Sequence, residues 1–253
     1  MAIRSPKPLI LVSNDDGIYS DGIRTLARHL KVLGKVIVVA PDQERSAASH
    51  SLTLHRPLRV KKLGADMYAV DGTPTDCITI GVKEILPRRP DIIVSGINKG
   101  ANLGDDVHYS GTVSAALEGA IMGIQGIALS MMTREKDGFD DASRFAVRLT
   151  RKVLKEGLPT GVILNVNFPP VAAGKIRGFQ FTKQGKRNYG DIIAERIDPR
   201  GRKYYWVGGD QEGFENNPGS DCNAILSNYI SITPIRVNLT DHQYLEEIKN
   251  WKL

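Results

Sequence analysis

The amino-acid sequence predicts an α/β sandwich with a mostly parallel sheet, and its first three elements carry the prediction. Leu9–Ser13 (LILVS) is apolar rather than alternating, which is typical of a strand buried in a parallel sheet. Asp21–Leu33 follows with its apolar residues on one helical face, Gly34 ends this helix, and Lys35–Pro41 is a second β-branched run. A strand, a helix and a strand in this order form a βαβ unit, in which the two strands are parallel.

The same alternation continues through about the first 170 residues. The further predicted strands are Leu58–Lys62 and Met67–Val70, as a hairpin around Gly64, and then Asp91–Ser95, Gly126–Met131 and Gly161–Asn165. The further predicted helices begin at Thr73-Pro74, with Thr as the N-cap, and cover about Gly111–Gly123 and Asp140–Glu156. A loop rich in Gly, Asn and Asp is expected from Gly96 to Tyr109.

The composition is that of an ordinary globular protein. The chain has 253 residues, 41% apolar and 25% charged, which suffices for one large domain with a sizeable core. No stretch approaches the roughly eighteen apolar residues of a membrane span, and no signal-peptide pattern is present, so we expect a soluble cytoplasmic protein. The net charge of +6 favours anionic ligands. Cys77 and Cys222 lack metal-ligand spacing, and we expect reduced thiols, one of them buried.

The C-terminal part has a different character from the first 170 residues. Residues 183–209 interleave basic and aromatic side chains, which predicts an exposed β-hairpin arm with its tip at Asp198–Gly201. Such an arm suits either single-stranded nucleic acid or a neighbouring subunit, because both surfaces favour aromatic and basic residues. We favour the subunit interface. A late strand at Tyr229–Pro234 and a terminal helix at Asp241–Trp251 complete the chain.

Three polar segments follow predicted strands. They are Ser13–Gly17 after the first strand, Pro41–Ser46 after the second, and Ser95–Gly100 after the Asp91 strand, continuing to Thr112. In an open α/β sheet, ligands bind beyond the carboxyl ends of the strands. We therefore expect the three segments to converge on one edge of the sheet and to form the functional site there.

Asp15 and Asp16 are the strongest chemical signal in these segments. Adjacent carboxylates repel each other unless a positive charge lies between them, and a hard divalent cation such as Mg²⁺ or Mn²⁺ supplies it. Ser46 and Asn98 offer neutral oxygens from the neighbouring segments, and Gly17 allows the chain to turn so that both carboxylates reach one ion. The alternative is a turn and helix-capping cluster. At the end of a buried first strand, we favour the metal.

The segment Tyr109–Ala116 opens a helix with small and hydroxyl-bearing residues. Free backbone N–H groups and the helix dipole make such a start an anion site, with Ser110, Gly111 and Thr112 as the phosphate-binding candidates. The alternative is a plain N-cap at Ser110. Opposite a metal, the phosphate interpretation is the stronger one. His108 is either a phosphate ligand or an incidental loop residue, and the sequence does not decide between them.

Two other enzyme classes fail at the first strand. A phosphatase with an aspartyl-phosphate intermediate needs a nucleophilic Asp followed two residues later by an acid Asp, but Asn14 precedes Asp16 and Gly17 follows Asp15 at that spacing. A dinucleotide-dependent oxidoreductase needs a glycine-rich turn in place of Asn-Asp-Asp-Gly. The alternative of another class is a non-catalytic nucleic-acid-binding protein that uses the basic arm.

Several blocks, taken together and in order, resemble the survival protein E (SurE) family of metal-dependent 5′/3′-nucleotidases. The blocks are LVSNDDGIYSDGI (Leu11–Ile23), VVAPDQERSAASHSLT (Val38–Thr53), VDGTPTDC (Val70–Cys77), VSGINKGANLGDDVHYSGTVSAALEGA (Val94–Ala120) and YISITPI (Tyr229–Ile235). The resemblance implies a Rossmann-like three-layer sandwich that forms a single domain over residues 1–253. Its core would span about residues 1–175, and residues 176–253, with the arm and the terminal helix, would serve oligomerisation.

The resemblance also implies an activity and a set of site residues. It implies hydrolysis of nucleoside 5′- and also 3′-monophosphates, with short polyphosphate as a further substrate, and one divalent ion per subunit: Mg²⁺ or Mn²⁺, with Ca²⁺ as a substitute in crystals. The implied metal ligands are Asp15, Asp16, Ser46 and Asn98. Asn102 is expected to face the substrate, and Asp15 or Asp16 is the best candidate for the general base. The implied assembly is a homodimer or homotetramer, and neither a membrane nor nucleic acid is expected as a partner.

Overall fold

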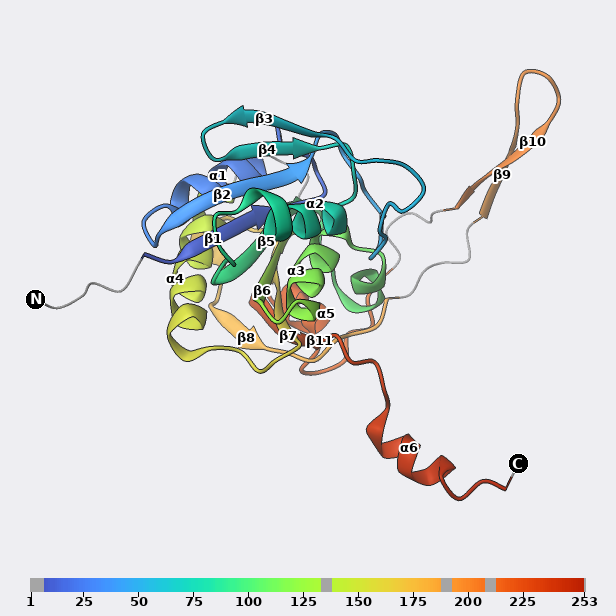
Figure 1. Ribbon diagram of the computed structural model, residues 1–253. Helices are drawn as coiled ribbons and strands as arrows, with labels where there is room; N and C mark the ends of the chain where they lie inside the picture. The colour runs from blue at the N-terminus through green and yellow to red at the C-terminus, as the bar shows by residue number, and fades with distance from the viewer. Residues whose placement is uncertain (1–6, 133–137, 188–192, 208–212, 253) are drawn as a thin grey trace, which may run out of the picture.

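The computed structural model describes residues 7–132, 138–187, 193–207 and 213–252, and these residues fold around one large sheet. The nine strands follow the order β3-β4-β2-β1-β5-β6-β7-β11-β8 (Figure 1). Strands β2, β1, β5, β6 and β7 are mutually parallel, and β4 is parallel to β2. Strand β3 is antiparallel to β4, and β11 is antiparallel to β7. The prediction of a mostly parallel α/β sheet is confirmed.

The elements have the following bounds. The strands of the sheet are β1 (Leu9–Ser13), β2 (Lys35–Pro41), β3 (Val60–Gly64), β4 (Met67–Val70), β5 (Ile92–Lys99), β6 (Gln125–Met131), β7 (Val162–Phe168), β8 (Phe179–Phe181) and β11 (Ile230–Arg236). The helices are α1 (Asp21–Leu30), α2 (Pro74–Ile80), α3 (Gly111–Ile121), α4 (Phe139–Glu156), α5 (Asp221–Leu226) and α6 (His242–Ile248). A π-helical turn covers Gly81–Ile85, and short 3₁₀ helices cover Gly104–His108 and Ala173–Lys175.

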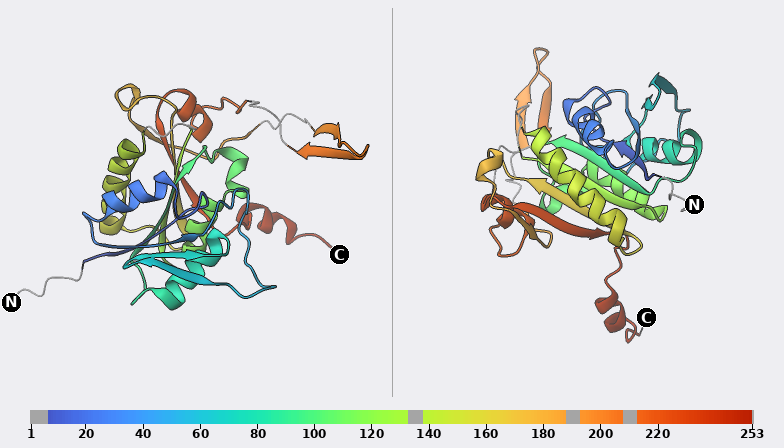
Figure 2. Two further views of the ribbon diagram at one scale, coloured as in Figure 1. Left: turned by 90° about the horizontal axis from the view of Figure 1, so that it is seen from above. Right: turned by 90° about the vertical axis from the view of Figure 1, so that its left-hand side faces the viewer.

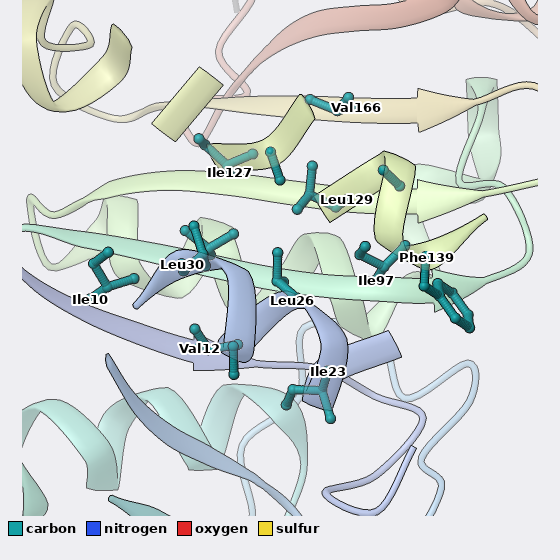
Figure 3. Close-up of a cluster of buried hydrophobic side chains, with 14 of the residues drawn as sticks. Ile10, Val12, Ile23, Leu26, Leu30, Ile97, Ile127, Leu129, Phe139 and Val166 are labelled. Carbon is teal, nitrogen blue, oxygen red and sulfur yellow. The ribbon is translucent and has the colours of Figure 1, made fainter. Parts of the chain in front are cut away.

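Two helical layers cover the faces of the sheet, so the fold is the predicted three-layer sandwich (Figure 2). Helices α1 and α4 pack together on one face, and α2 and α3 pack together on the other. Successive side chains of a strand point to opposite faces. Ile10 and Val12 of β1 therefore join the core under α1 and α4 (Figure 3), whereas Leu9 and Leu11 join the core under α2.

Local signals in the sequence place the helix boundaries. Thr73 caps α2 as predicted: its side chain accepts the N–H of Asp76, and the Asp76 carboxylate accepts the N–H of Thr73 in return. Helix α1 was predicted to reach Leu33, but it ends at Leu30 and a turn follows. At Gly34 a Cβ atom would lie 2.0 Å from the Pro8 carbonyl oxygen, so the chain has already left the helix to approach β1.

Two predicted strands are longer in the structure by two residues or more. Strand β5 runs to Lys99 instead of stopping at Ser95, because the chain is irregular after Ser95 and pairs with β6 again at Asn98 and Lys99. The expected loop over Gly96–Tyr109 therefore starts only at Gly100, and Asn98 lies at the end of a strand. Strand β7 likewise extends to Phe168.

The predicted arm is present as a two-stranded antiparallel sheet of β9 (Ile193–Ile197) and β10 (Lys203–Val207), which projects from the body (Figure 1). Asp198 shapes its tip by accepting the N–H groups of Arg200 and Arg202, both at 2.8 Å. Large side chains on both strands are exposed, among them Ile193, Ile197, Tyr204, Tyr205 and Trp206. Residues 188–192 and 208–209 of the predicted arm lie outside the described residues.

The remaining C-terminal elements include two that the sequence patterns did not predict, the edge strand β8 and the short helix α5. The predicted terminal helix is present over His242–Ile248 and projects away from the sheet (Figure 1).

Cys77 and Cys222 are both free thiols, as predicted. Both are buried, whereas the sequence predicted one buried thiol. Among the described residues, no helix is both long and apolar enough to cross a membrane.

Candidate metal and phosphate site

The structure brings the three polar segments together at the carboxyl edge of the sheet. The backbone carbonyl of Asp15 accepts the N–H of Arg45 at 2.8 Å, which joins the first segment to the second. The Asp16 carboxylate accepts the N–H of Lys99, at the end of β5, at 3.1 Å. The Asp15 carboxylate accepts a hydrogen bond from the hydroxyl of Thr112, in the first turn of α3. The aspartate pair therefore connects the second segment, β5 and α3.

Gly17 makes the turn that separates the two aspartates from α1. Its φ of +89° lies in the region that favours glycine, and a Cβ atom there would lie 3.0 Å from the carbonyl carbon of Gln43. The buried Asn14 closes the turn by donating from its amide to the Gly17 carbonyl at 3.0 Å and to the Ser20 hydroxyl at 2.8 Å. Asn14 thus has a structural role, and this frees the aspartates for other partners.

Burial makes the aspartate pair costly to ionise in the protein alone. Burial raises the pKa of Asp15, against the opposing effect of the Thr112 hydrogen bond. Burial, and next the charge of Asp15, raise the pKa of Asp16 from 3.8 to about 6. A bound divalent cation would reverse this effect, because it stabilises the ionised form of both carboxyl groups.

The other two predicted metal ligands lie on the neighbouring segments. Ser46 is exposed, and its hydroxyl donates to the Glu44 carboxylate at 2.6 Å. Asn98 is half-buried, and its amide nitrogen donates to the Gly100 carbonyl at 2.9 Å, a bond that does not involve its side-chain oxygen. Among the residues that the structure describes, no three His, Cys, Asp or Glu side chains form a metal-binding cluster. Two carboxylates with neutral oxygens fit Mg²⁺ or Mn²⁺, which retain several water ligands.

The start of α3 lies directly against Asp15. Ser110 is the N-cap, as the alternative interpretation proposed, and its hydroxyl accepts the Val113 N–H at 3.1 Å. A Cβ atom on Gly111 would lie 2.8 Å from the Asp15 Cβ, so only glycine allows this approach. A helix start carries unpaired N–H groups and a partial positive charge. These N–H groups therefore lie beside the Asp15 carboxyl group.

Asn102 belongs to a buried polar network that the sequence analysis missed. Its amide nitrogen donates to the Ser130 hydroxyl at 2.6 Å, and its backbone N–H donates to the Asn167 side chain at 2.8 Å. Its carbonyl accepts the amide groups of Asn165 at 2.9 Å and Asn167 at 3.0 Å. Two asparagines spaced two apart in an apolar strand share one face and were the available signal. The network holds the beginning of the loop between β5 and α3.

A second missed feature is a buried carboxylate on α3. Glu118 accepts hydrogen bonds from His50 at 2.9 Å and from Thr79 at 3.1 Å, and the His50 bond lowers the pKa of Glu118. His50 belongs to the loop after β2, which carries Ser46. The Ser49 N–H also donates to the Tyr109 carbonyl at 3.2 Å, so this loop is joined both to α3 at Glu118 and to the residue before the N-cap of α3. His108 is exposed.

The fold and the site define an α/β-sandwich protein with a pair of adjacent carboxyl groups at the carboxyl edge of its parallel strands. The family model described as survival protein SurE matches residues 10–191. The chain belongs to the SurE family, which confirms the resemblance noted in the sequence.

Relatives and solved structures are similar to the chain over almost its whole length. A protein named 5′-nucleotidase SurE from Pelobacter propionicus is 53% identical over 96% of this chain and 98% of its own length. A second, with the same name, from Geobacter sulfurreducens is 50% identical over 96% of this chain and 94% of its own. The crystal structure of the SurE protein from Aquifex aeolicus is 44% identical, with a TM-score of 0.87, and the match covers 96% of this chain and 98% of that one.

Proposed function

We propose that the protein is a divalent-metal-dependent phosphomonoesterase that hydrolyses nucleoside 5′-monophosphates to nucleoside and phosphate. Nucleoside 3′-monophosphates and short polyphosphate are proposed as further substrates. The observation that supports the proposal is the contact between Asp15 and the first turn of α3, because helix starts carry the unpaired N–H groups that bind phosphate. The names of the relatives, 5′-nucleotidase SurE, support the choice of substrate class.

We propose that Asp15, Asp16, Asn98 and Ser46 hold one Mg²⁺ or Mn²⁺ ion. When bound, the ion supplies Lewis-acid stabilisation of the phosphoryl oxygens and a lowered pKa for a coordinated water. Ser46 can offer a lone pair of its hydroxyl oxygen while its hydrogen remains on the Glu44 carboxylate. Asn98 can offer its side-chain oxygen while its amide nitrogen remains on the Gly100 carbonyl.

The protein's own groups bind and orient the phosphate. The N–H groups at the start of α3, around Gly111 and Thr112, bind the phosphate oxygens with Ser110 as the cap of that turn. The Thr112 hydroxyl already donates its hydrogen to Asp15, so Thr112 contributes through its backbone. Asp15 or Asp16 takes a proton from the attacking water while the bond between phosphorus and the nucleoside oxygen breaks, and the leaving oxygen takes up a proton from solvent.

We propose that the arm of β9 and β10 binds another copy of the chain and builds a homodimer or homotetramer. The support is the set of large exposed side chains on both of its strands, including Ile193, Ile197 and Trp206. Within the described residues, these side chains lie on a sheet that pairs with no other strand.

A panel of nucleoside monophosphates, assayed by phosphate release with several divalent ions, tests the proposed function. We expect a chelator to abolish turnover and Mn²⁺ or Mg²⁺ to restore it. Full turnover in excess chelator, with the purified protein shown to be metal-free, contradicts the metal mechanism. The absence of phosphate release from the whole panel, together with salt-sensitive nucleic-acid binding in a gel-shift assay, would favour the non-catalytic alternative.

A further inference from the structure

The C-terminal part of the chain is joined to the loop between β5 and α3 through one buried carboxylate. Asp221, the first residue of α5, is fully buried. One of its carboxylate oxygens accepts the Gly104 N–H from this loop at 3.0 Å. The other accepts the Gly185 N–H, at the root of the arm, and the Cys222 N–H, each at 2.8 Å. A single side chain therefore connects three segments that are far apart in the sequence.

Further contacts strengthen the same junction. The Gln184 amide donates to the Gly104 carbonyl at 3.0 Å. The Arg187 N–H donates to the Asp105 carboxylate at 3.2 Å, and the Arg187 guanidinium forms an ion pair with Asp106. Gly104 has a φ of +52°, and a Cβ atom there would lie 3.2 Å from the carbonyl group of Gly185. The root of the arm is thus in close contact with the loop at Gly104, Asp105 and Asp106.

The position of this loop matters because both of its ends belong to the candidate site. The loop begins after Asn98 and Lys99 at the end of β5 and ends at Ser110, the cap of α3. The asparagine network around Asn102 holds its first half, and the junction at Asp221 holds its second half. A site on a loop is as well ordered as the contacts that support the loop.

The buried position of Asp221 is energetically unfavourable for a charged side chain. A carboxylate that is removed from water destabilises the folded protein unless hydrogen bonds to its charge offset the lost hydration. Three backbone N–H groups provide such bonds at Asp221. Their directions also fix where each of the three segments lies relative to the others.

We infer that Asp221 is a positioning residue for phosphate binding, because its carboxylate fixes the loop that carries the N-cap of α3. This inference rests on the proposed function, in which the start of α3 binds the phosphate. Three of the four proposed metal ligands, Asp15, Asp16 and Ser46, lie on other segments. The fourth, Asn98, lies in β5, before the half of the loop that Asp221 holds. Loss of the junction therefore weakens phosphate binding more than metal binding.

Asp221→Asn tests this inference with a small change. An asparagine keeps one oxygen, which can still accept the Gly185 and Cys222 N–H groups, while its NH₂ group then faces the Gly104 N–H. Thr182→Val is the matched control: it removes a buried hydrogen bond to Thr233, at 2.7 Å, in the same part of the chain. Each variant loses one buried hydrogen bond, but in the variant at 221 the lost bond is the one between the side chain and the loop.

The readouts are the inhibition constant of inorganic phosphate and the Mn²⁺ concentration for half-maximal activity, both followed by nucleoside release from a nucleoside 5′-monophosphate. Thermal melting shows that each variant is folded at the assay temperature. We expect Asp221→Asn to raise the inhibition constant about fivefold or more, with the Mn²⁺ requirement changed by less than about twofold. The control should leave both values at those of the wild type.

An unchanged inhibition constant in folded Asp221→Asn overturns the inference, and so does an equal rise in the control. If Asp221→Asn does not fold, Arg187→Gln replaces it, since this change removes the ion pair with Asp106 and keeps the backbone bond to Asp105. We expect a rise of about threefold, and a value equal to that of the wild type overturns the inference. A wild-type protein that releases no nucleoside with any metal contradicts the proposed function instead.

Discussion

Asp16→Asn separates the electrostatics of the candidate site from its fold. The substitution removes one charge from the carboxylate pair and keeps an oxygen that can accept the Lys99 N–H. Burial and the charge of Asp15 raise the pKa of Asp16 from 3.8 to about 6. In a fully buried group, this change in pKa would lower the free energy of unfolding at neutral pH by about 3 kcal/mol. Asp16 is only partly buried, and solvent screening leaves roughly 1–2 kcal/mol.

The sign of this effect depends on pH. A carboxyl group with a raised pKa stabilises the folded state below its unfolded pKa, here 3.8, and this stabilisation is lost as the pH rises through about 6. At neutral pH, Asp16→Asn should therefore raise the melting temperature of the metal-free protein by about 2–8 °C. Below pH 3.8 the two proteins should melt alike, because Asp16 is then protonated in both states.

Metal ions should reverse the order of stability of the wild type and Asp16→Asn. The loss of a metal ligand should also lower turnover. Mn²⁺ stabilises the form that binds it, so it should raise the melting temperature of the wild type more than that of Asp16→Asn. The phosphatase activity of the variant should fall by about a hundredfold or more. Asp42→Asn is the matched control, since Asp42 is exposed on the adjoining segment and pairs with Arg45 at 3.6 Å.

Thermal melting in chelator and in Mn²⁺, at neutral and acid pH, measures the change in stability. Phosphate release at limiting metal measures the loss of activity. Asp42→Asn should match the wild type within about twofold in activity. If metal-free Asp16→Asn melts below the wild type at neutral pH, or retains near-full activity at limiting metal, the assignment of Asp16 to an ion site is wrong.

Three further substitutions test other parts of the structure. Gly111→Ala places a Cβ atom 2.8 Å from the Asp15 Cβ, so phosphate release should fall by about tenfold or more, and wild-type activity would show that the close approach is dispensable. Replacing residues 193–207 by a short Gly-Ser link should lower the molar mass in light scattering without lowering the melting temperature; an unchanged mass contradicts the role of the arm. Glu118→Gln should lower the melting temperature at neutral pH, because the His50 hydrogen bond holds the pKa of Glu118 below 4.5. This difference should fade as the pH falls below that value, and a pH-independent difference would contradict the reasoning.

The sequence by itself determined the elements whose signals are local. The run Leu9–Ser13, apolar up to Ser13, became the buried strand β1 with unchanged bounds, because burial on both faces favours apolar side chains at successive positions. Thr73-Pro74 marked the start of α2, because the N–H groups of a helix start need a local acceptor. The alternation of strands and helices predicted that the segments of Asp15 and Thr112 meet at one edge of the sheet, because the carboxyl ends of parallel strands lie at the same edge.

Only the tertiary structure decided how these residues are held. Strand β5 reaches Asn98 because β6 offers hydrogen-bond partners there, which a polar Gly-rich sequence does not reveal. Asn165 looked like the end of a strand, but it binds the Asn102 carbonyl from the strand's interior. The role of Asp221 depends on Gly104, which is 117 positions away. Long-range hydrogen bonds of this kind leave no periodicity in the sequence, because their partners meet only after the sheet has assembled.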